Sequence, residues 1–234
     1  LRLEMALGTM EIGLTGMVRT ETVEEVVPGE NGEEDSVTTS ELAVPKLGLD
    51  WSAGIWELDF TAEASASFQD ETRLSKFTAG DREVLIQAAG GVSYTHKYSA
   101  EDFLVVGVEY FFNPDGHDSK GDYPDLFQSG GFTPFYMGKH YGAAYLALPG
   151  PGTWDHTNFN ISNIANFSDM SFVSRFDYSV SVLTYLTVQA YAQVHYGEPR
   201  GEFRFGLAAN EFFPGSPEIP NQLYTVGVNL RIDM

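Results

Sequence analysis

Apolar and polar side chains alternate along this chain over windows as long as a β-strand. Over residues 56–68, Trp, Leu, Phe and Ala positions alternate with Glu, Asp, Thr and Ser positions. Successive side chains of a strand point to opposite faces, so this segment predicts a strand with one apolar and one polar face. Residues 186–196 and 224–234 repeat the pattern. No helical period competes with it, and the chain is predicted to be all-β.

Weaker versions of the same alternation predict further antiparallel strands, about eleven in all. These further strands lie at 1–7, 11–20, 42–51, 84–95, 103–112, 141–148, 158–167 and 172–181. Pro45 falls inside one of them and cannot donate to a ladder, so a disruption of that strand is expected there.

The connections between these strands alternate in length. Short links are expected at 8–10, 52–54, 97–102, 149–155 and 182–185, and long ones at 21–41, 69–83, 113–140 and 197–222. Bacterial membrane barrels have short turns on the periplasmic side and long loops outside, which gives this alternation. The link 168–171 is an exception, since it is short where a long one is due.

Aromatic residues gather at the predicted strand ends. Trp51 and Trp56 flank a short link, and other aromatics lie beside the long connections. Amphipathic rings favour the membrane interface, so the pattern predicts two girdles. The girdle candidates are Trp51, Trp56, Phe68, Tyr110, Phe112, Tyr196 and Tyr224.

A water-soluble β-sandwich with one solvated face is the alternative, because its strands also alternate. The longest segments here exceed the usual five or six residues of globular strands and approach the ~9–11 of a tilted membrane strand. The polar positions also contain little of the lysine that protects soluble sheet edges. A membrane barrel is therefore favoured.

The segment 224–234 carries an apolar side chain at every second position up to the last residue. In this pattern the chain resembles the bacterial outer-membrane porin-like β-barrels, in which such a terminal strand serves as the assembly signal. Met234 departs from the aromatic residue that usually ends it. The resemblance implies one transmembrane barrel over 1–234 in the Gram-negative outer membrane, in contact with its lipid and lipopolysaccharide. It leaves open a homo-oligomer or envelope protein partners, and it carries over no active-site residue.

Strand parity gives a further expectation. If the last strand ends in the periplasm, the strand at 1–7 starts outside the cell. Single-chain bacterial barrels normally have an even number of strands. Eleven strands therefore predict the C-terminal portion of a longer even-stranded barrel.

Composition narrows the function. The net charge is -20, with 13 Lys and Arg against 33 Asp and Glu, which argues against nucleic acid as a partner. The absence of cysteine excludes disulfides and thiolate metal sites.

The polar strand faces are where function is expected, since the lipid face tolerates almost no charge. Functionally, their acids would make a cation-favouring pore wall; structurally, they would fill a rigid, salt-bridged lumen. The lumen-lining candidates are Glu57, Asp59, Glu63, Glu11, Arg19, Lys46, Asp50, Glu109, Gln189, Gln193, His195 and Arg231.

Two long connections carry candidate chemistry. The segment 21–41 is rich in acids and could bind divalent cations loosely, although a solvated loop is the preferred interpretation. The segment 113–140 is the candidate for a loop that folds inward and narrows a channel, or caps its mouth. Its constriction candidates are Tyr123, Asp125, Phe127 and Phe135.

No catalytic motif appears among the five histidines, so no enzyme activity and no tightly bound cofactor are predicted. An outer-membrane hydrolase that depends on His195 is the third hypothesis. The leading hypothesis is a passive pore for small solutes. The second is a plugged structural barrel that serves as a scaffold in an envelope assembly.

Overall fold

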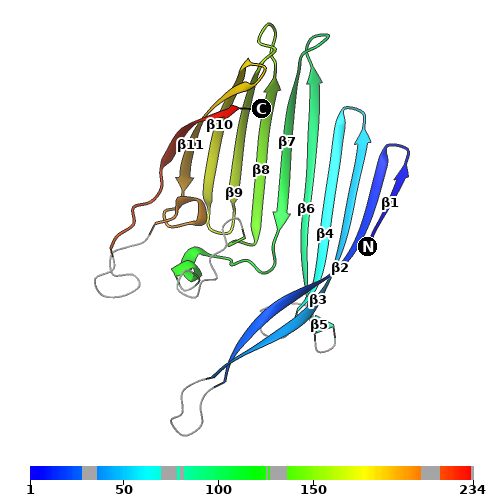
Figure 1. Cartoon of the computed structure of the whole chain (residues 1–234), viewed down its shortest axis with the longest axis vertical. Coiled ribbons are helices and arrows are strands. Elements are labelled where there is room, and N and C mark those ends of the chain that lie inside the picture. Colours follow the sequence, from blue (N-terminus) through cyan, green and yellow to red (C-terminus); the bar gives the residue numbers. More distant parts are fainter. Residues whose placement is uncertain are drawn as a thin grey trace.

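Eleven antiparallel strands form one open sheet in the computed structural model, which describes residues 1–27, 36–69, 78–79, 82–124, 126, 136–206 and 217–232. Each strand pairs with the next one along the chain, and a short extra strand, β5, pairs only with β6. Figure 1 shows a curved wall with β1 at one edge and the C-terminal strands at the other. The predicted all-β class and the number of strands are confirmed. The strands are β1 (Arg2–Leu7), β2 (Met10–Val27), β3 (Ser36–Ile55), β4 (Leu58–Gln69), β5 (Thr78–Ala79), β6 (Arg82–Lys97), β7 (Phe103–Phe112), β8 (His140–Pro149), β9 (Thr157–Asn166), β10 (Ser171–Leu183), β11 (Leu186–Gly197) and β12 (Tyr224–Ile232).

With the exception of 167–170, the short turns lie at one end of the sheet, as the predicted alternation of connection lengths requires. We call this the turn end, which is uppermost in Figure 1, and the opposite end the loop end. One predicted link, 52–54, is wrong, because β3 continues to Ile55. Ile55 pairs with Leu58 around a two-residue turn, in which Trp56 takes a left-handed backbone with φ of 57°. The apolar alternation therefore runs through 52–54 without a break.

The predicted loop 21–41 is mostly strand. Residues 21–27 and 36–41 extend β2 and β3, which stay paired as far as Val27 and Ser36. Figure 1 shows this ribbon projecting beyond the loop end. The side chains of 21–42 lie outside the described part of the chain, so the cation prediction for this segment stays a prediction.

Pro45 does not interrupt β3, contrary to expectation. It pairs with Val18 of β2, while the ladder between β3 and β4 begins only at Lys46 and Ser67. A proline has no N–H to donate. From Pro45 toward its N-terminus β3 is therefore paired with β2 alone, and from Lys46 onward it is paired with both β2 and β4.

The ladders fix which side chains share a face. Leu3 lies opposite Leu14, Leu14 opposite Leu49, and the same apolar row continues across the sheet. Where strand side chains are described, every Asp, Glu, Lys and Arg of the ladders belongs to the other face, from Arg2 on β1 to Arg231 on β12. We call these the apolar face and the polar face. The apolar face is largely uncovered: Leu3, Val108 and Val228 are 60, 49 and 69 % exposed.

The sheet does not close on itself. β1 and β12 each pair with one neighbour only. Both run from the loop end to the turn end, since ten antiparallel pairings separate them in the strand order. The start of β1 at the loop end is the orientation that strand parity predicts.

Buried residues are few among the described ones, and most of them lie near the loop end, apart from a few such as Ala53 and Thr157. Tyr141, Val173 and Phe203 form a core cluster, with Phe111 and Ile164 packed against it. Phe203 comes from a 3-10 turn, η3 (Glu202–Arg204), and the other four point from the polar face of β7–β10. The η3 turn after β11 therefore packs onto the polar face. No helix in the described residues is long and apolar enough to cross a membrane.

Candidate functional site

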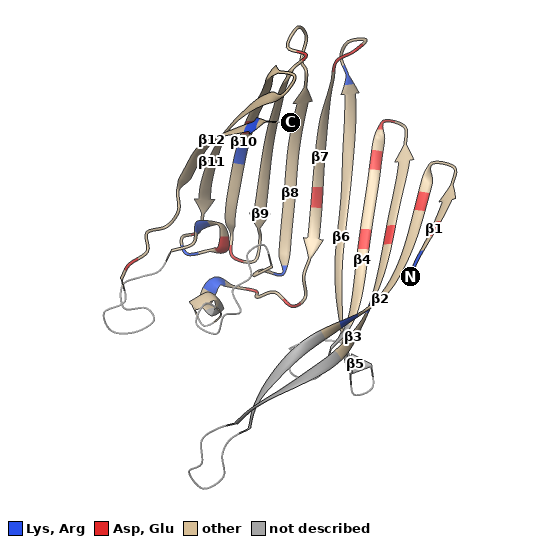
Figure 2. Ribbon diagram, in the orientation of Figure 1, with Lys and Arg blue, Asp and Glu red and all other residues tan. Residues whose placement is uncertain are grey.

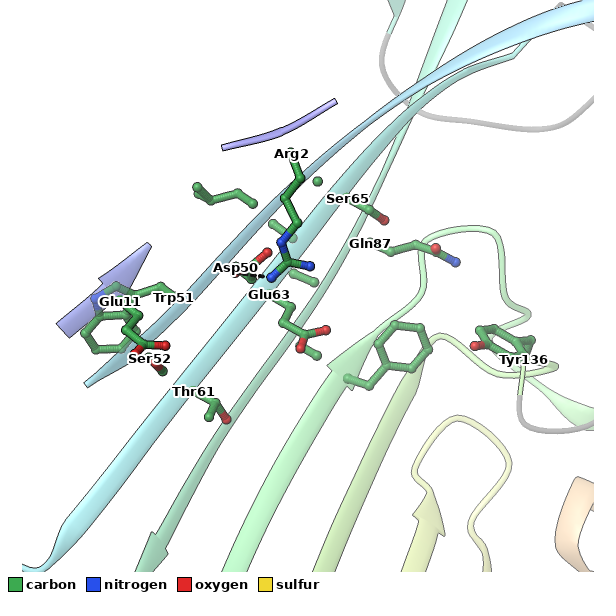
Figure 3. Close-up of a pocket in the computed structure, with 16 residues that line it drawn as sticks. Arg2, Glu11, Asp50, Trp51, Ser52, Thr61, Glu63, Ser65, Gln87 and Tyr136 are labelled. Carbon is green, nitrogen blue, oxygen red and sulfur yellow. Dashed lines mark ion pairs between the residues drawn. The ribbon is translucent and has the colours of Figure 1, made fainter. Parts of the chain in front are cut away.

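The polar face carries a hollow of about 500 Å³ over β1–β7, and acidic side chains lie around it. Glu11 of β2, Asp50 of β3 and Glu63 of β4 line it together with Arg2 (Figure 3). Asp50 and Glu63 are direct cross-strand partners. Thr61, Ser65 and Gln87 add neutral polar groups, and Phe111 and Tyr136 close the side toward the loop end. Six strands, β1, β2, β3, β4, β6 and β7, thus contribute to one hollow.

Arg2 balances only part of this negative charge. Its guanidinium lies 2.6 Å from Glu4 and 3.5 Å from Asp50. Two carboxylates opposite each other on neighbouring strands repel, and this repulsion destabilises the pair unless a cation lies near. Arg2 and Asp50 have side chains 57 and 39 % exposed, so their pairing is screened and weak. The hollow therefore keeps a negative potential that a dissolved cation can reach.

Glycines make room for the large side chains of the polar face. A Cβ on Gly13 would lie 2.1 Å from Oδ2 of Asp50, its cross-strand partner. Gly91 stands in the same relation to Glu109, with 2.9 Å to Cγ. The acidic side chains therefore lean sideways over a neighbouring strand, which leaves the space above the sheet open. The tyrosines at 145 and 191 lean in the same way over Gly107 and Gly227.

The other predicted lumen-lining residues belong to the polar face but not to this hollow. Glu57 is the exception, since it does not belong to the polar face of a strand. It lies in the turn before β4, which starts at Leu58. Asp59 follows it on β4, and Glu109 lies on β7. The remaining polar-face residues are Arg19, Lys46, Gln189, Gln193, His195 and Arg231.

Most acids of the polar face lie on β1–β7, which also carry the bases Arg2, Arg19, Lys46 and Lys97. Figure 2 shows this concentration of acids on the β1–β7 side, and it shows basic residues on β10 and β12 as well. Arg175 of β10 is paired with Asp177 at 2.6 Å, and its guanidinium lies 4.3 Å from the ring centre of Tyr191. Arg175 is thus neutralised by its own strand, whereas the acids on the other side are not matched one to one. The alternation of polar and apolar positions does not by itself predict this pair.

A buried polar network joins the long connections to the short turn 167–170. The Tyr123 hydroxyl donates to Oδ2 of Asp169 at 2.8 Å, and the backbone N–H of Glu202 donates to the same oxygen at 2.7 Å. Nδ2 of Asn166 donates to both carboxylates, at 3.1 and 2.9 Å. The Tyr141 hydroxyl donates to Oε2 of Glu202 at 2.6 Å. We call these five residues the loop-end cap.

The loop-end cap explains why 168–171 is short. Asp169 is the anchor to which segments from both neighbouring long connections attach, and it is only 5 % exposed. A long loop here would displace that anchor. Sequence reasoning missed the network, although the exceptional length of this link was its signal.

Tyr123 is an anchor and not a channel-lining residue, which corrects the constriction prediction at this position. Its side chain is 3 % exposed, and burial together with the neighbouring Asp169 raises its pKa well above the ordinary value. A group that lines a constriction would face the open lumen. Asp125, Phe127 and Phe135 lie outside the described residues. The described part of the connection does fold over the polar face, where the ring of Tyr136 packs edge-on against Phe111.

His195 has a structural role. It is 8 % exposed, and Nδ1 donates to the carbonyl oxygen of Phe203 at 2.5 Å. Nε2 lies 2.9 Å from the side-chain amide of Gln193 and can accept from it. Both ring nitrogens are therefore engaged in holding η3 against β11. Among the described residues, no group of three His, Cys, Asp or Glu side chains could hold a metal ion.

The aromatic candidates fall at both ends of the apolar face. Near the loop end, Phe172 and Tyr196 stack at 5.3 Å, and the Tyr110 hydroxyl lies 2.6 Å from Nδ1 of His140. Tyr224, at 74 % exposure, and Phe112 lie at the same end. Near the turn end, Trp56 is 93 % exposed and Trp51 belongs to the apolar face. The side chain of Phe68 lies outside the described part of the chain.

The comparisons with known proteins give no relative. No family model, no curated protein and no solved structure matches the chain. The functional argument therefore rests on the two faces and on the loop end.

Proposed function

We propose that this chain forms the wall of an outer-membrane β-barrel that lets small cations and neutral solutes pass. The observation that carries the proposal is the separation of charge between the faces. Every described charged side chain of the ladders is on the polar face, while apolar side chains such as Val108 and Val228 are exposed on the other. Large exposed apolar surfaces mark interaction with a membrane or a partner. A face on which none of the described ladder side chains is charged fits lipid.

Closure of the barrel is part of the proposal. Unpaired backbone groups cost several kcal/mol each in hydrocarbon, so neither edge of the sheet can face lipid. Pairing β1 directly with β12 would be parallel, because both strands run toward the turn end. An odd number of further strands between them would make every pairing antiparallel and give an even total, as the sequence analysis predicts.

The selectivity follows from the uneven charge of the polar face. Glu11, Asp50 and Glu63 surround a hollow in which Arg2 is the basic residue. In a water-filled lumen, one unit charge at 4 Å changes the energy of an ion by ~1 kcal/mol, roughly fivefold in local concentration. Phe203 and Tyr136 pack onto the polar face, and in the proposed barrel they narrow the lumen at the loop end.

Conductance in planar lipid bilayers tests this function. We expect steady ohmic openings whose reversal potential in a salt gradient shows preference for cations. Glu63→Gln should lower the cation-to-anion permeability ratio by up to about fivefold. Glu101→Gln is the matched control, because it removes an equal charge from the exposed turn after β6 and should leave the ratio unchanged. A folded but silent barrel would favour the structural scaffold, and an unchanged ratio in Glu63→Gln would refute the acidic pore wall.

A further inference from the structure

The apolar face holds a second hollow, of about 740 Å³, over β4–β11. Its floor is made of small residues, among them Gly90, Ala144 and Ala165. Aromatic rings form its walls. Its volume lies in the range of ordinary small-molecule sites, ~300–1,000 Å³. The wall residues are Phe60, Tyr110, Phe167, Phe172 and Tyr196.

One polar cluster interrupts this otherwise apolar surface. Asn163 of β9, Ser174 of β10 and Tyr196 of β11 occupy apolar-face positions in the register. Nδ2 of Asn163 donates to the Tyr196 hydroxyl at 2.7 Å and to Oγ of Ser174 at 2.9 Å. Oγ of Ser174 also donates to the Tyr196 hydroxyl, at 3.3 Å. Polar groups on a membrane-facing surface are rare and mark functional sites.

The cluster retains one hydroxyl proton without an acceptor. The Tyr196 oxygen accepts from both neighbours, so its own O–H has no acceptor within the described part of the chain. If Tyr196 and Ser174 exchanged roles, the proton of Ser174 would be left in the same position. An unmet donor is costly away from water. The ring of Tyr196 is 43 % exposed and stacked on Phe172, which fixes it at the wall of the hollow.

From this geometry we propose a lipid-binding site in which the hollow holds an acyl chain and the Tyr196 hydroxyl donates to the ester carbonyl oxygen of that chain. The inference rests on the proposed membrane location of the apolar face. An acyl chain satisfies the apolar floor and walls. An ester oxygen accepts a hydrogen bond but has no proton to donate. It therefore complements the Tyr196 hydroxyl proton, which has no acceptor in the described part of the chain. The position near the loop-end girdle places the carbonyl at interface depth.

Native mass spectrometry of the protein released from detergent tests the site, with a diester phosphatidylethanolamine and its diether analogue as probes. The wild type should retain one diester lipid about fivefold more strongly than the diether lipid, the value of one hydrogen bond. Tyr196→Phe should retain both lipids equally. Tyr224→Phe is the matched control, since this exposed apolar-face tyrosine lies outside the hollow and should behave as the wild type.

Filling the hollow gives a second, independent variant. Gly90→Leu should abolish retention of both lipids, and its Cβ has room because the nearest other atom is 3.8 Å away. Equal retention of diester and diether lipids by the wild type would overturn the assigned hydrogen bond. A dimer that persists without lipid and is lost in Gly90→Leu would assign the hollow to a second copy instead. Protein that inserts and conducts but keeps no lipid refutes this site alone, whereas protein that fails to insert refutes the proposed function as well.

Discussion

Single hydrogen bonds hold the long connections at the mouth of the sheet. The Tyr123 hydroxyl donates to Asp169 and accepts from Asn166, and all three side chains are buried. Asp169 in turn accepts from the backbone of Glu202 in the other connection. Loss of one donor leaves a buried carboxylate short of a partner, which costs more than the bond itself contributes.

Tyr123→Phe should therefore loosen the loop-end cap by about 1–3 kcal/mol, since it removes only the hydroxyl. Limited proteolysis of the folded protein in lipid measures the effect, and cleavage within 113–139 and 198–206 should accelerate about tenfold. Tyr185→Phe, at an exposed turn position, is the control and should cleave as the wild type. Equal cleavage of wild type and Tyr123→Phe would show that the network does not hold the connections.

The raised pKa of Tyr123 gives the cap a dependence on alkaline pH. Burial favours the neutral phenol in the closed cap, while an opened cap lets Tyr123 ionise near its ordinary value of about 10. The contribution of Tyr123 to the stability of the closed cap is therefore fully present below pH ~10 and is lost as the pH rises beyond it. Tyrosinate absorbance titration should give the same amplitude for wild type and Tyr123→Phe up to about pH 11. A loss of one tyrosine equivalent near pH 10 in the variant would contradict this.

At the level of the strands, some large side chains lie over a glycine of the neighbouring strand. A Cβ on Gly107 would lie 2.3 Å from the ring of Tyr145, its cross-strand partner on β8. Gly48 is also in a polar-face ladder, but there the nearest atom would be 3.7 Å away. The two glycines have the same backbone role and differ in the space around them.

Gly107→Ala should lower the free energy of unfolding by about 1–3 kcal/mol through overpacking, whereas Gly48→Ala should change it little. Urea unfolding in lipid vesicles measures both. Adding Tyr145→Leu should recover most of the loss in Gly107→Ala, because the ring that clashes is gone. Equal effects at positions 107 and 48 would mean that the ring does not occupy this space.

The strands and their two faces could be predicted from sequence because alternation is a local signal. Glu63, Asp50 and Glu109 were assigned to the correct face on that basis alone. The turn at Trp56 was misplaced, since Ser52 and Gly54 resemble turn residues although the ladder runs through them. The loop-end cap was beyond reach, because Tyr123, Asp169 and Glu202 are separated by tens of residues and meet only after three connections fold.

At the scale of the whole molecule, the proposed membrane barrel requires one face in lipid and the other in water. The sheet of the described chain is open, and the described charged side chains of its ladders belong to one face. A water-soluble protein would have to cover the apolar face, and within the described residues Leu3, Val108 and Val228 are left at 60, 49 and 69 % exposure. A membrane covers that face without a protein partner.

Single-cysteine scanning of β7 and β12 in lipid vesicles tests this requirement most directly, since the chain has no cysteine of its own. A water-soluble thiol reagent should label Val105→Cys, Glu109→Cys and Asn229→Cys, which lie on the polar face. It should leave Val106→Cys, Val108→Cys and Val228→Cys unlabelled, because lipid covers the apolar face. Labelling at both sets of positions at the same rate would contradict a membrane barrel.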